Sequence, residues 1–167
     1  MYAVSYTHLT IKSYSGATGD AESPRNIIDG DTNPRDIHNK WCNINSTHEC
    51  VIDLQGDYRI YGFKIFDCKS GPESNENFGN YRIYLSEDGI NWKLLVDEQG
   101  RERDNIKEDY IVPTTARYVK LNPYSCLLYT SNRWRTETGN QNCGDIPLPF
   151  TLITATFELK PKRREKK

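Results

Sequence analysis

Short segments that alternate apolar and polar residues, separated by Gly, Asn and Asp, constrain this chain most. The clearest pair is NYRIYLS and WKLLVDE, which are separated by the turn signal EDGIN. An Asp-Gly turn between two alternating runs is typical of a β-hairpin. No segment carries helical periodicity over about ten residues or more. These features predict an antiparallel all-β domain.

Further strands are expected on both sides of this hairpin. CVIDL is a short apolar run, and TARYVKLNP alternates. Alternation divides YRIYGFKIFDC into two faces, one with Ile60, Gly62, Lys64 and Phe66 and the other with Tyr61, Phe63 and Ile65. One short helical turn is expected around ESPRNIIDG. Short strands at this spacing favour an antiparallel β-sandwich or jelly roll.

Composition excludes several classes of partner. The net charge of -1 gives no electrostatic case for binding nucleic acid or an anionic membrane. No stretch approaches the ~20 apolar residues of a membrane span, and the start of the chain lacks the pattern of a signal peptide. The five cysteines form no CxxC pair, which argues against a zinc cluster. Cys42 and Cys50 could form a disulfide or remain half-buried thiols.

Motifs for catalysis are absent from the sequence. His8, His38 and His48 have no G-x-S-x-G elbow nearby, and neither H-E-x-x-H nor a phosphate-binding loop occurs. Carboxylates are plentiful, but the sequence does not identify a pair at the separation that glycoside hydrolysis needs. The chain is therefore not expected to be an enzyme.

The polar loop at residues 26–42 contains candidate metal ligands. Asp29 and Asp31 flank Gly30, and Asn33 follows shortly after. Calcium prefers six to eight hard oxygen ligands, many of which are backbone carbonyls on a tight loop. The same residues also suit an ordinary Asx turn, so the motif alone leaves both interpretations open.

A second polar loop, residues 68–80, carries the groups that a sugar-binding site needs. They are a cation, two amides and an aromatic ring: Lys69, Asn75, Asn77 and Phe78. Amides and ammonium groups hydrogen-bond to sugar hydroxyls, and a ring stacks on the apolar face of a pyranose. The alternative is a solvated polar loop without a ligand.

Taken together, these stretches resemble a known family. NIIDGDTNP…KWC, VIDLQGDYRIYGFKIFDCKSG, NFGNYRIYLSEDGINWKLLVDEQG and DNIKEDYIVPTTARYVKLNPY follow the order and spacing of the discoidin domain. This domain is also called the coagulation factor V/VIII type C domain. The similarity is greatest to bacterial family 32 carbohydrate-binding modules and runs over residues 14–124. It implies an eight-stranded, galactose-binding-like jelly-roll sandwich.

The resemblance also implies a structural calcium ion in the first loop. A carboxylate from the last strand completes this site in the family. Its counterparts here are Asp29, Asp31, Asn33 and Glu158, although the aligned position could instead be Thr156, which has no charge. The resemblance thus raises the expectation of calcium above what the Asp-Gly-Asp motif alone supports.

Family members that bind galactose use a His after the loop Trp, an Arg, an Asn and stacking aromatic rings. In this chain Cys42 follows Trp41, Lys69 falls near the Arg position, and Asn75 or Asn77 fills the Asn position. His38 is the candidate substitute for the missing His. The resemblance therefore implies a glycan ligand, of the galactose or N-acetylhexosamine type, without fixing the sugar.

The function expected from this resemblance is non-catalytic glycan binding. The domain would be a monomeric module of a secreted bacterial glycoside hydrolase, located outside the cell or at its surface. The alternative is a discoidin-type adhesion domain that binds protein or lipid head groups. Such domains use apolar loop tips, whereas the tip SGPESNEN is polar, which favours sugar over membrane.

Each end of the chain carries a short peptide of unusual sequence. One nucleotide sequence, read in two different frames, encodes both peptides. VSYTHL (residues 4–9) and CLLYTS (residues 126–131) are related in this way, and the nucleotides resemble a transposon mosaic end. We therefore expect an artefactual leader at 1–10, a discoidin-like domain at 11–125 and a doubtful segment at 126–167. That last segment contains a strand candidate at 151–159 and a basic tail at 160–167, so the last strands of the sandwich would be missing or replaced.

Overall fold

The computed structural model describes most of the β-rich body of the chain. The described residues are 8–17, 19–30, 40–43, 48–66, 80–99, 106–124, 150–152 and 154–161, the last two ranges as backbone. Cys68, Cys126, Cys143 and residues 162–167 of the basic tail lie outside these residues, whereas Lys160 and Pro161 belong to a described strand. No helix among the described residues is long and apolar enough to cross a membrane.

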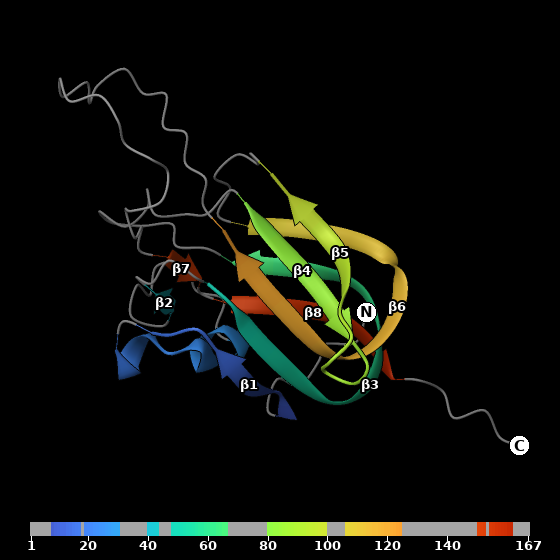
Figure 1. Ribbon diagram of the computed structural model, residues 1–167, viewed down its shortest axis with the longest axis horizontal. Helices are drawn as coiled ribbons and strands as arrows, with labels where there is room; N and C mark the ends of the chain where they lie inside the picture. The colour runs from blue at the N-terminus through green and yellow to red at the C-terminus, as the bar shows by residue number, and fades with distance from the viewer. Residues whose placement is uncertain are drawn as a thin grey trace, which may run out of the picture.

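The described residues form β-strands and two short 3₁₀ helices, with no α-helix among them (Figure 1). The strands are β1 Thr10–Tyr14, β2 Trp41–Asn43, β3 Cys50–Phe66, β4 Tyr81–Ser86, β5 Lys93–Glu98, β6 Ile106–Pro123, β7 Phe150–Leu152 and β8 Thr154–Pro161. The helices are η2 Asp20–Glu22 and η3 Pro24–Ile28. The predicted hairpin is β4–β5, and the predicted helical turn is η3, so both predictions are confirmed. The fold class, an antiparallel all-β sandwich, is confirmed as well.

Two long strands, β3 and β6, build both layers of the sandwich. Their register connects residues 50–53 of β3 with 118–121 of β6, and residues 58–66 of β3 with 106–116 of β6. The first pairing belongs to a layer with the strand order β1–β3–β6–β4–β5, and the second to a layer in which β8 joins β3. Figure 1 shows β3 and β6 bending sharply between the layers.

The bend in β3 explains one incorrect prediction. Strict alternation places Ile60 on the face opposite to Phe63 and Ile65, yet all three are buried. The pairing with β6 shifts register between Ile60 and Gly62, which turns the following residues to the other face. A second irregularity follows Asp53, where Gln55 has a positive φ of 61°.

The β4–β5 turn is held by one carboxylate. Asp88 Oδ1 accepts hydrogen bonds from the backbone N–H groups of Ile90 and Asn91, each at 2.8 Å, and from Ser86 Oγ at 2.9 Å. Gly89 has a φ of 75° and donates its N–H to Ser86 Oγ at 2.8 Å. The Asp-Gly sequence therefore supplies both the turn acceptor and the left-handed residue.

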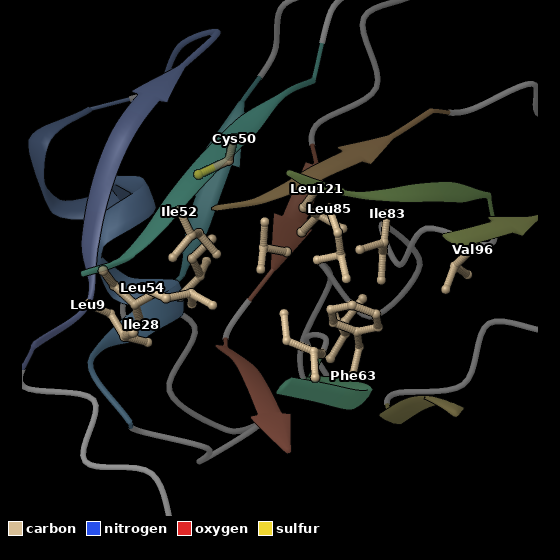
Figure 2. Packing of buried hydrophobic residues seen from close by; sticks show 14 of the residues in the cluster. Leu9, Ile28, Cys50, Ile52, Leu54, Phe63, Ile83, Leu85, Val96 and Leu121 are labelled. Atoms are coloured by element: carbon tan, nitrogen blue, oxygen red, sulfur yellow. The ribbon is translucent and has the colours of Figure 1, made fainter. Parts of the chain in front are cut away.

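Apolar side chains from both layers and from η3 fill the interior. Figure 2 shows Ile83 and Leu85 of β4 pointing toward Phe63 of β3, while Leu9 and Ile28 gather near Leu54. The largest fully buried side chains are Tyr81, Lys107, Ile27, Ile52, Leu54, Ile60, Ile65, Ile83, Leu85 and Val119. One aliphatic core thus connects the sheets and holds η3 against the sandwich.

Candidate functional site

Loops collect at one end of the sandwich, as the strand register and the bends of β3 and β6 show (Figure 1). Tyr81, the first residue of β4, lies beside Glu98 at the end of β5 and Pro123 at the end of β6. Phe66, the last residue of β3, lies beside Ile106 and Thr154, the first residues of β6 and β8. The connections that leave these strand ends therefore start from one end of the molecule, the loop end.

The opposite end contains the β4–β5 turn and the bends of β3 and β6. Figure 1 shows this turn and the two bends close together, away from the strand ends that lead into the long connections. We call this the turn end. The predicted loop at 68–80 starts and finishes at the loop end, since it joins β3 to β4.

The first polar loop, residues 26–42, has fixed ends. Ser23 Oγ caps η3 by accepting the N–H of Arg25 at 3.3 Å. Asn26 Nδ2 donates to the carbonyl oxygen of Lys40 at 2.8 Å, which joins the two ends of the loop. The buried Trp41 donates its indole N–H to Gly16 O at 2.8 Å. Segments far apart in sequence thus hold this loop in place.

Asp29 is the one predicted calcium ligand whose side chain the structure describes. It follows η3 with helical φ and ψ of -82° and -12°, and it is exposed. Gly30 has a φ of 88°, in the region that favours glycine, so the chain turns sharply after Asp29. An exposed carboxylate before a left-handed glycine fits a loop that supplies oxygen ligands to a hard cation.

The structure describes little of the other predicted calcium ligands. Asp31 and Asn33 lie outside the described residues. Glu158 lies on β8 between Phe157, which pairs with Phe63, and Leu159, which pairs with Ile60. Only its backbone is described, and it falls midway along the strand. Within the described part of the chain, no group of three or more His, Cys, Asp or Glu side chains is arranged to hold a metal.

Hydrogen bonds also brace the C-terminal end of the second loop and the entry to β3. Tyr124 N donates to Asn80 O at 3.0 Å, next to the start of β4. Asn122 Nδ2 donates to His48 O at 2.6 Å. These bonds join the end of β6 to the residues that enter β4 and β3. All five predicted ligand-binding residues lie outside the described part of the chain: His38, Lys69, Asn75, Asn77 and Phe78.

The structure shows a cluster of side chains at the rim of the loop end that the sequence analysis did not predict. Tyr124 Oη donates to Asp97 Oδ1 at 2.7 Å, and Arg82 Nε donates to the same oxygen at 3.1 Å. The Arg82 guanidinium also lies 4.4 Å from the centre of the Tyr124 ring. The tyrosine hydroxyl, followed by Arg82, keeps the pKa of Asp97 below its usual range. The alternation of β4 predicts an outward Arg82, but its partners come from β5 and β6.

The cysteine at the family's His position is not available to a ligand at the surface. Cys42 and Cys50 are both buried, and no disulfide joins them in the structure. Burial, followed by the nearby Glu49 charge, raises the pKa of the Cys50 thiol far above its ordinary value. The structure is consistent with two buried thiols rather than with a disulfide between Cys42 and Cys50.

Solved structures with the same fold are carbohydrate-binding and chitobiase domains. The C-terminal domain of a chitobiase from Bacteroides fragilis has a TM-score of 0.68 and 19% identity, covering 95% of this chain and 98% of that one. CpGH89CBM32-5 from Clostridium perfringens, solved with GalNAc-β-1,3-galactose, has a TM-score of 0.66 and 18% identity, covering 93% and 99%. The family 32 carbohydrate-binding module of C. perfringens NanJ, solved with galactose, has a TM-score of 0.67 and 15% identity, covering 93% and 96%.

At these identities the similarity establishes the fold. No curated protein matches the chain by sequence. The family model of the F5/8 type C domain matches residues 9–142, which is most of the chain. The match includes the capped turn at Asp29, both long strands and the β4–β5 hairpin. The chain therefore belongs to the F5/8 type C, or discoidin, domain family.

Proposed function

We propose that this domain is a non-catalytic glycan-binding module whose ligand site is formed by the polar loops at the loop end. The observation that carries the proposal is that hydrogen bonds hold both ends of loop 26–42 and the C-terminal end of loop 68–80. Glycan complexes of domains with this fold, such as the NanJ module with galactose, support the choice of ligand class. Rigid anchors beneath a polar loop reduce the entropy lost when a ligand binds.

The proposed contacts are those that sugar chemistry requires. Lys69, Asn75 and Asn77 would hydrogen-bond to ring hydroxyls, and Phe78 would stack on the apolar face of a galactose-type or N-acetylhexosamine-type sugar. His38, from the first loop, would contribute a further hydrogen bond. An amide that meets a sugar hydroxyl contributes roughly 1–3 kcal/mol, because its loss leaves a desolvated partner unpaired.

The absence of catalysis is part of the same proposal. Among the described residues, the carboxylates with lowered pKa values have structural causes: Arg117 beside Asp53, the turn N–H groups around Asp88, Tyr124 beside Asp97, and Lys64 beside Glu108. Perturbed groups with structural explanations give no support to an active site. We therefore assign binding, and not hydrolysis, to this chain.

We further propose that calcium stabilises the first loop. Asp29, Asp31 and Asn33 would supply oxygen ligands together with backbone carbonyls, and Glu158 of β8 would complete the set. Bound calcium would hold the loop by charge neutralisation and take no part in chemistry. The exposed Asp29 before the left-handed Gly30 supports this assignment.

Thermal unfolding with and without a chelator tests the calcium proposal. Binding to the folded state alone raises stability by about 2.7 kcal/mol at a hundredfold excess over Kd. Calcium should raise the Tm of the wild type, and Asp29→Ala should abolish that difference. Asp57→Ala, which removes an exposed aspartate at the turn end, is the control and should retain the calcium response. A wild type that ignores the chelator contradicts the proposal.

The wider setting we propose is a monomeric module of a secreted bacterial glycoside hydrolase, where it would hold the enzyme on its substrate outside the cell. The chitobiase domain from B. fragilis supports this setting. The second candidate, an adhesion domain for protein or lipid head groups, is tested alongside. Vesicles of phosphatidylserine and phosphatidylcholine serve as the probe for lipid binding.

A glycan array followed by calorimetry tests the binding site. Asn75→Ala and Lys69→Ala should each weaken binding of the best array ligand about tenfold, which corresponds to ~1.4 kcal/mol, with little change in Tm. Lys64→Ala is the matched control, because Lys64 lies on β3 in an ion pair with Glu108 on the outer surface. Normal binding by both loop variants, or binding to vesicles and not to glycans, contradicts the proposal.

A further inference from the structure

A groove lies at the turn end, away from the loops discussed above. Its volume is about 520 Å³, which is within the range of small-ligand sites. It is lined by the end of β4, the β4–β5 turn, the start of β5 and the bend of β6: Leu85, Ser86, Glu87, Asp88, Asn91, Lys93, Thr114 and Thr115. Three elements therefore bring polar side chains together on one concave surface.

One wall of this groove is already ordered by its own hydrogen bonds. Asp88 accepts from Ser86 Oγ, two backbone N–H groups and, through Oδ2, Asn91 Nδ2 at 2.7 Å. On the other side, Thr114 Oγ1 donates to Val112 O at 2.8 Å. A ligand that enters the groove consequently meets groups whose positions are fixed before binding, which lowers the cost of association.

Other lining groups are available to a ligand. The side chains of Glu87, Lys93 and Thr115 make no hydrogen bond or ion pair within the part of the chain that the structure describes. Glu87 is an acceptor, Lys93 is a donor, and the Thr115 hydroxyl can do both. They lie above Leu85, which is itself part of the core.

The combination of charges selects the class of ligand. An anionic ligand would meet the Glu87 and Asp88 carboxylates, and a cationic ligand would meet the Lys93 ammonium, so each would be repelled on one side. The Asp88 oxygens already accept hydrogen bonds from the turn, and a neutral molecule with several hydroxyls can satisfy Glu87, Lys93 and the Thr115 hydroxyl together. No aromatic ring is among the lining residues, so recognition would rest on hydrogen bonds at the edge of a sugar ring.

From these observations we propose that the groove is a second sugar site, which takes a single neutral hexose unit in the millimolar range. It is independent of the site proposed at the loop end. A domain that binds sugars at both ends joins two glycan chains, or two points on one chain, and gains avidity through effective concentration.

Titration of the ¹⁵N-labelled full chain with D-galactose tests this proposal. The amides of Gly89, Asn91 and Thr115 report on the groove, while those of Phe66 and Asn80 report on the loop end. We expect saturable shifts at the groove amides. Galacturonate should give a Kd at least threefold higher there, since its charge opposes Glu87, and glycerol should give no saturable shift.

Variants assign the response to the groove. The double variant Lys93→Met, Thr115→Val should lose the saturable shifts at Gly89 and Asn91. Arg59→Met, which removes an exposed cation from the strand paired with Thr115, should keep Kd within twofold of the wild type. If the double variant loses its dispersed spectrum, Lys93→Met alone must raise Kd at least threefold.

The two binding proposals fail separately. Shifts at Phe66 and Asn80 with none in the groove overturn the second site and leave the loop-end site standing. Shifts in the groove alone support the second site and exclude galactose, though not an N-acetylhexosamine, as the ligand of the loop end. Equal responses to galactose and glycerol at Gly89, or an unchanged Kd in Lys93→Met, overturn the groove as a sugar site.

Discussion

The two halves of β6, one in each layer of the sandwich, present their residues to the core in opposite ways. In the layer of β1, β3, β6, β4 and β5, apolar residues such as Ile83 and Leu121 point inward, while Arg82 and Lys120 lie on the outer face. In the other layer, Lys107 is fully buried opposite Ile65, whereas Tyr110 and Val112 of the same strand are 77% and 82% exposed. One strand, β6, therefore obeys the usual pattern in one half and inverts it in the other.

Polar side chains on the outer face and in the interior have different kinds of partner. On the outer face of the first layer, Lys120 Nζ lies 4.9 Å from the Tyr84 ring centre and 4.6 Å from that of Trp92, so cations lie over aromatic rings. In the interior, Tyr81 of β4 donates its hydroxyl across to Asp109 Oδ2 of the second layer at 2.6 Å. Both layers bury apolar side chains, and the first half of β6 in addition brings polar groups that need hydrogen bonds.

Truncation of the apolar interior of the first layer should have the largest effect. Leu121→Ala removes a buried side chain between Cys50 and Ile83, its partners on the neighbouring strands. We expect the free energy of unfolding to fall by about 2–5 kcal/mol, measured by urea denaturation. Leu94→Ala, on the exposed face of β5, is the control, and an equal loss in both variants would contradict the contrast between the faces.

The interior hydrogen bond between the two layers should give the next effect. Tyr81→Phe removes the hydroxyl that donates to Asp109 and leaves the ring in the core. We expect a loss of about 1–3 kcal/mol, because a carboxylate facing the core loses a donor. Tyr84→Phe, on the outer face of the same strand, should change the free energy of unfolding by less than about 0.5 kcal/mol. Equal values in the two variants would remove the distinction.

An ion pair in the first layer should give a smaller, pH-dependent effect. Arg117 Nε and Nη2 donate to Asp53 Oδ1 and Oδ2 at 2.9 and 3.0 Å, and this pairing lowers the pKa of Asp53. The resulting stability is present above the ordinary carboxyl pKa of about 3.9 and is lost as pH falls through the lower folded pKa.

Asp53→Asn should therefore cost about 1 kcal/mol at pH 7, a value reduced because Arg117 is partly exposed. The difference from wild type should shrink toward zero as pH falls through the lowered folded pKa of Asp53. Other carboxylates with lowered pKa values are shared by both proteins, so their contributions cancel. A difference that stays constant from pH 7 to pH 2.5, by urea denaturation, would show that the charge is not responsible.

The smallest effect is expected on the outer face of the second layer. Val112→Thr keeps a β-branched side chain and should change the free energy of unfolding by less than about 0.5 kcal/mol, since Val112 is exposed. A loss above 1 kcal/mol, measured by thermal and urea unfolding, would mean that another surface covers this strand. In that event Val112 would be a buried residue, and this half of β6 would follow the usual burial pattern.

Sequence reasoning predicted the parts of the fold in which local signals agree. The β4–β5 hairpin follows from Asp88 and Gly89, and η3 follows from Ser23 before Pro24. It missed β1, β2 and the first half of β6, and it read β3 as two segments. The irregularity after Asp53 resembles a loop in the sequence, although both flanks pair with β6 as one bent strand.

The candidate site was predictable only in outline. The Asp-Gly-Asp motif identified Asp29, and topology brings the loop at 68–80 to the loop end. The bonds that fix the ends of these loops join residues remote in sequence, such as Trp41 and Gly16 or Tyr124 and Asn80, so no local pattern reveals them. The domain boundaries remain a prediction, with Leu9 buried in the core and the family match covering residues 9–142.

The passage of β3 and β6 through both layers has a consequence for how the molecule opens. Neither layer can separate without breaking pairs along a strand that also belongs to the other, so the described strands have no boundary at which one layer can unfold alone. Amide exchange in the two halves of β6 should then proceed through the same global opening. A pull applied to one layer is passed covalently to the other, which suits a domain placed between an anchor and a load.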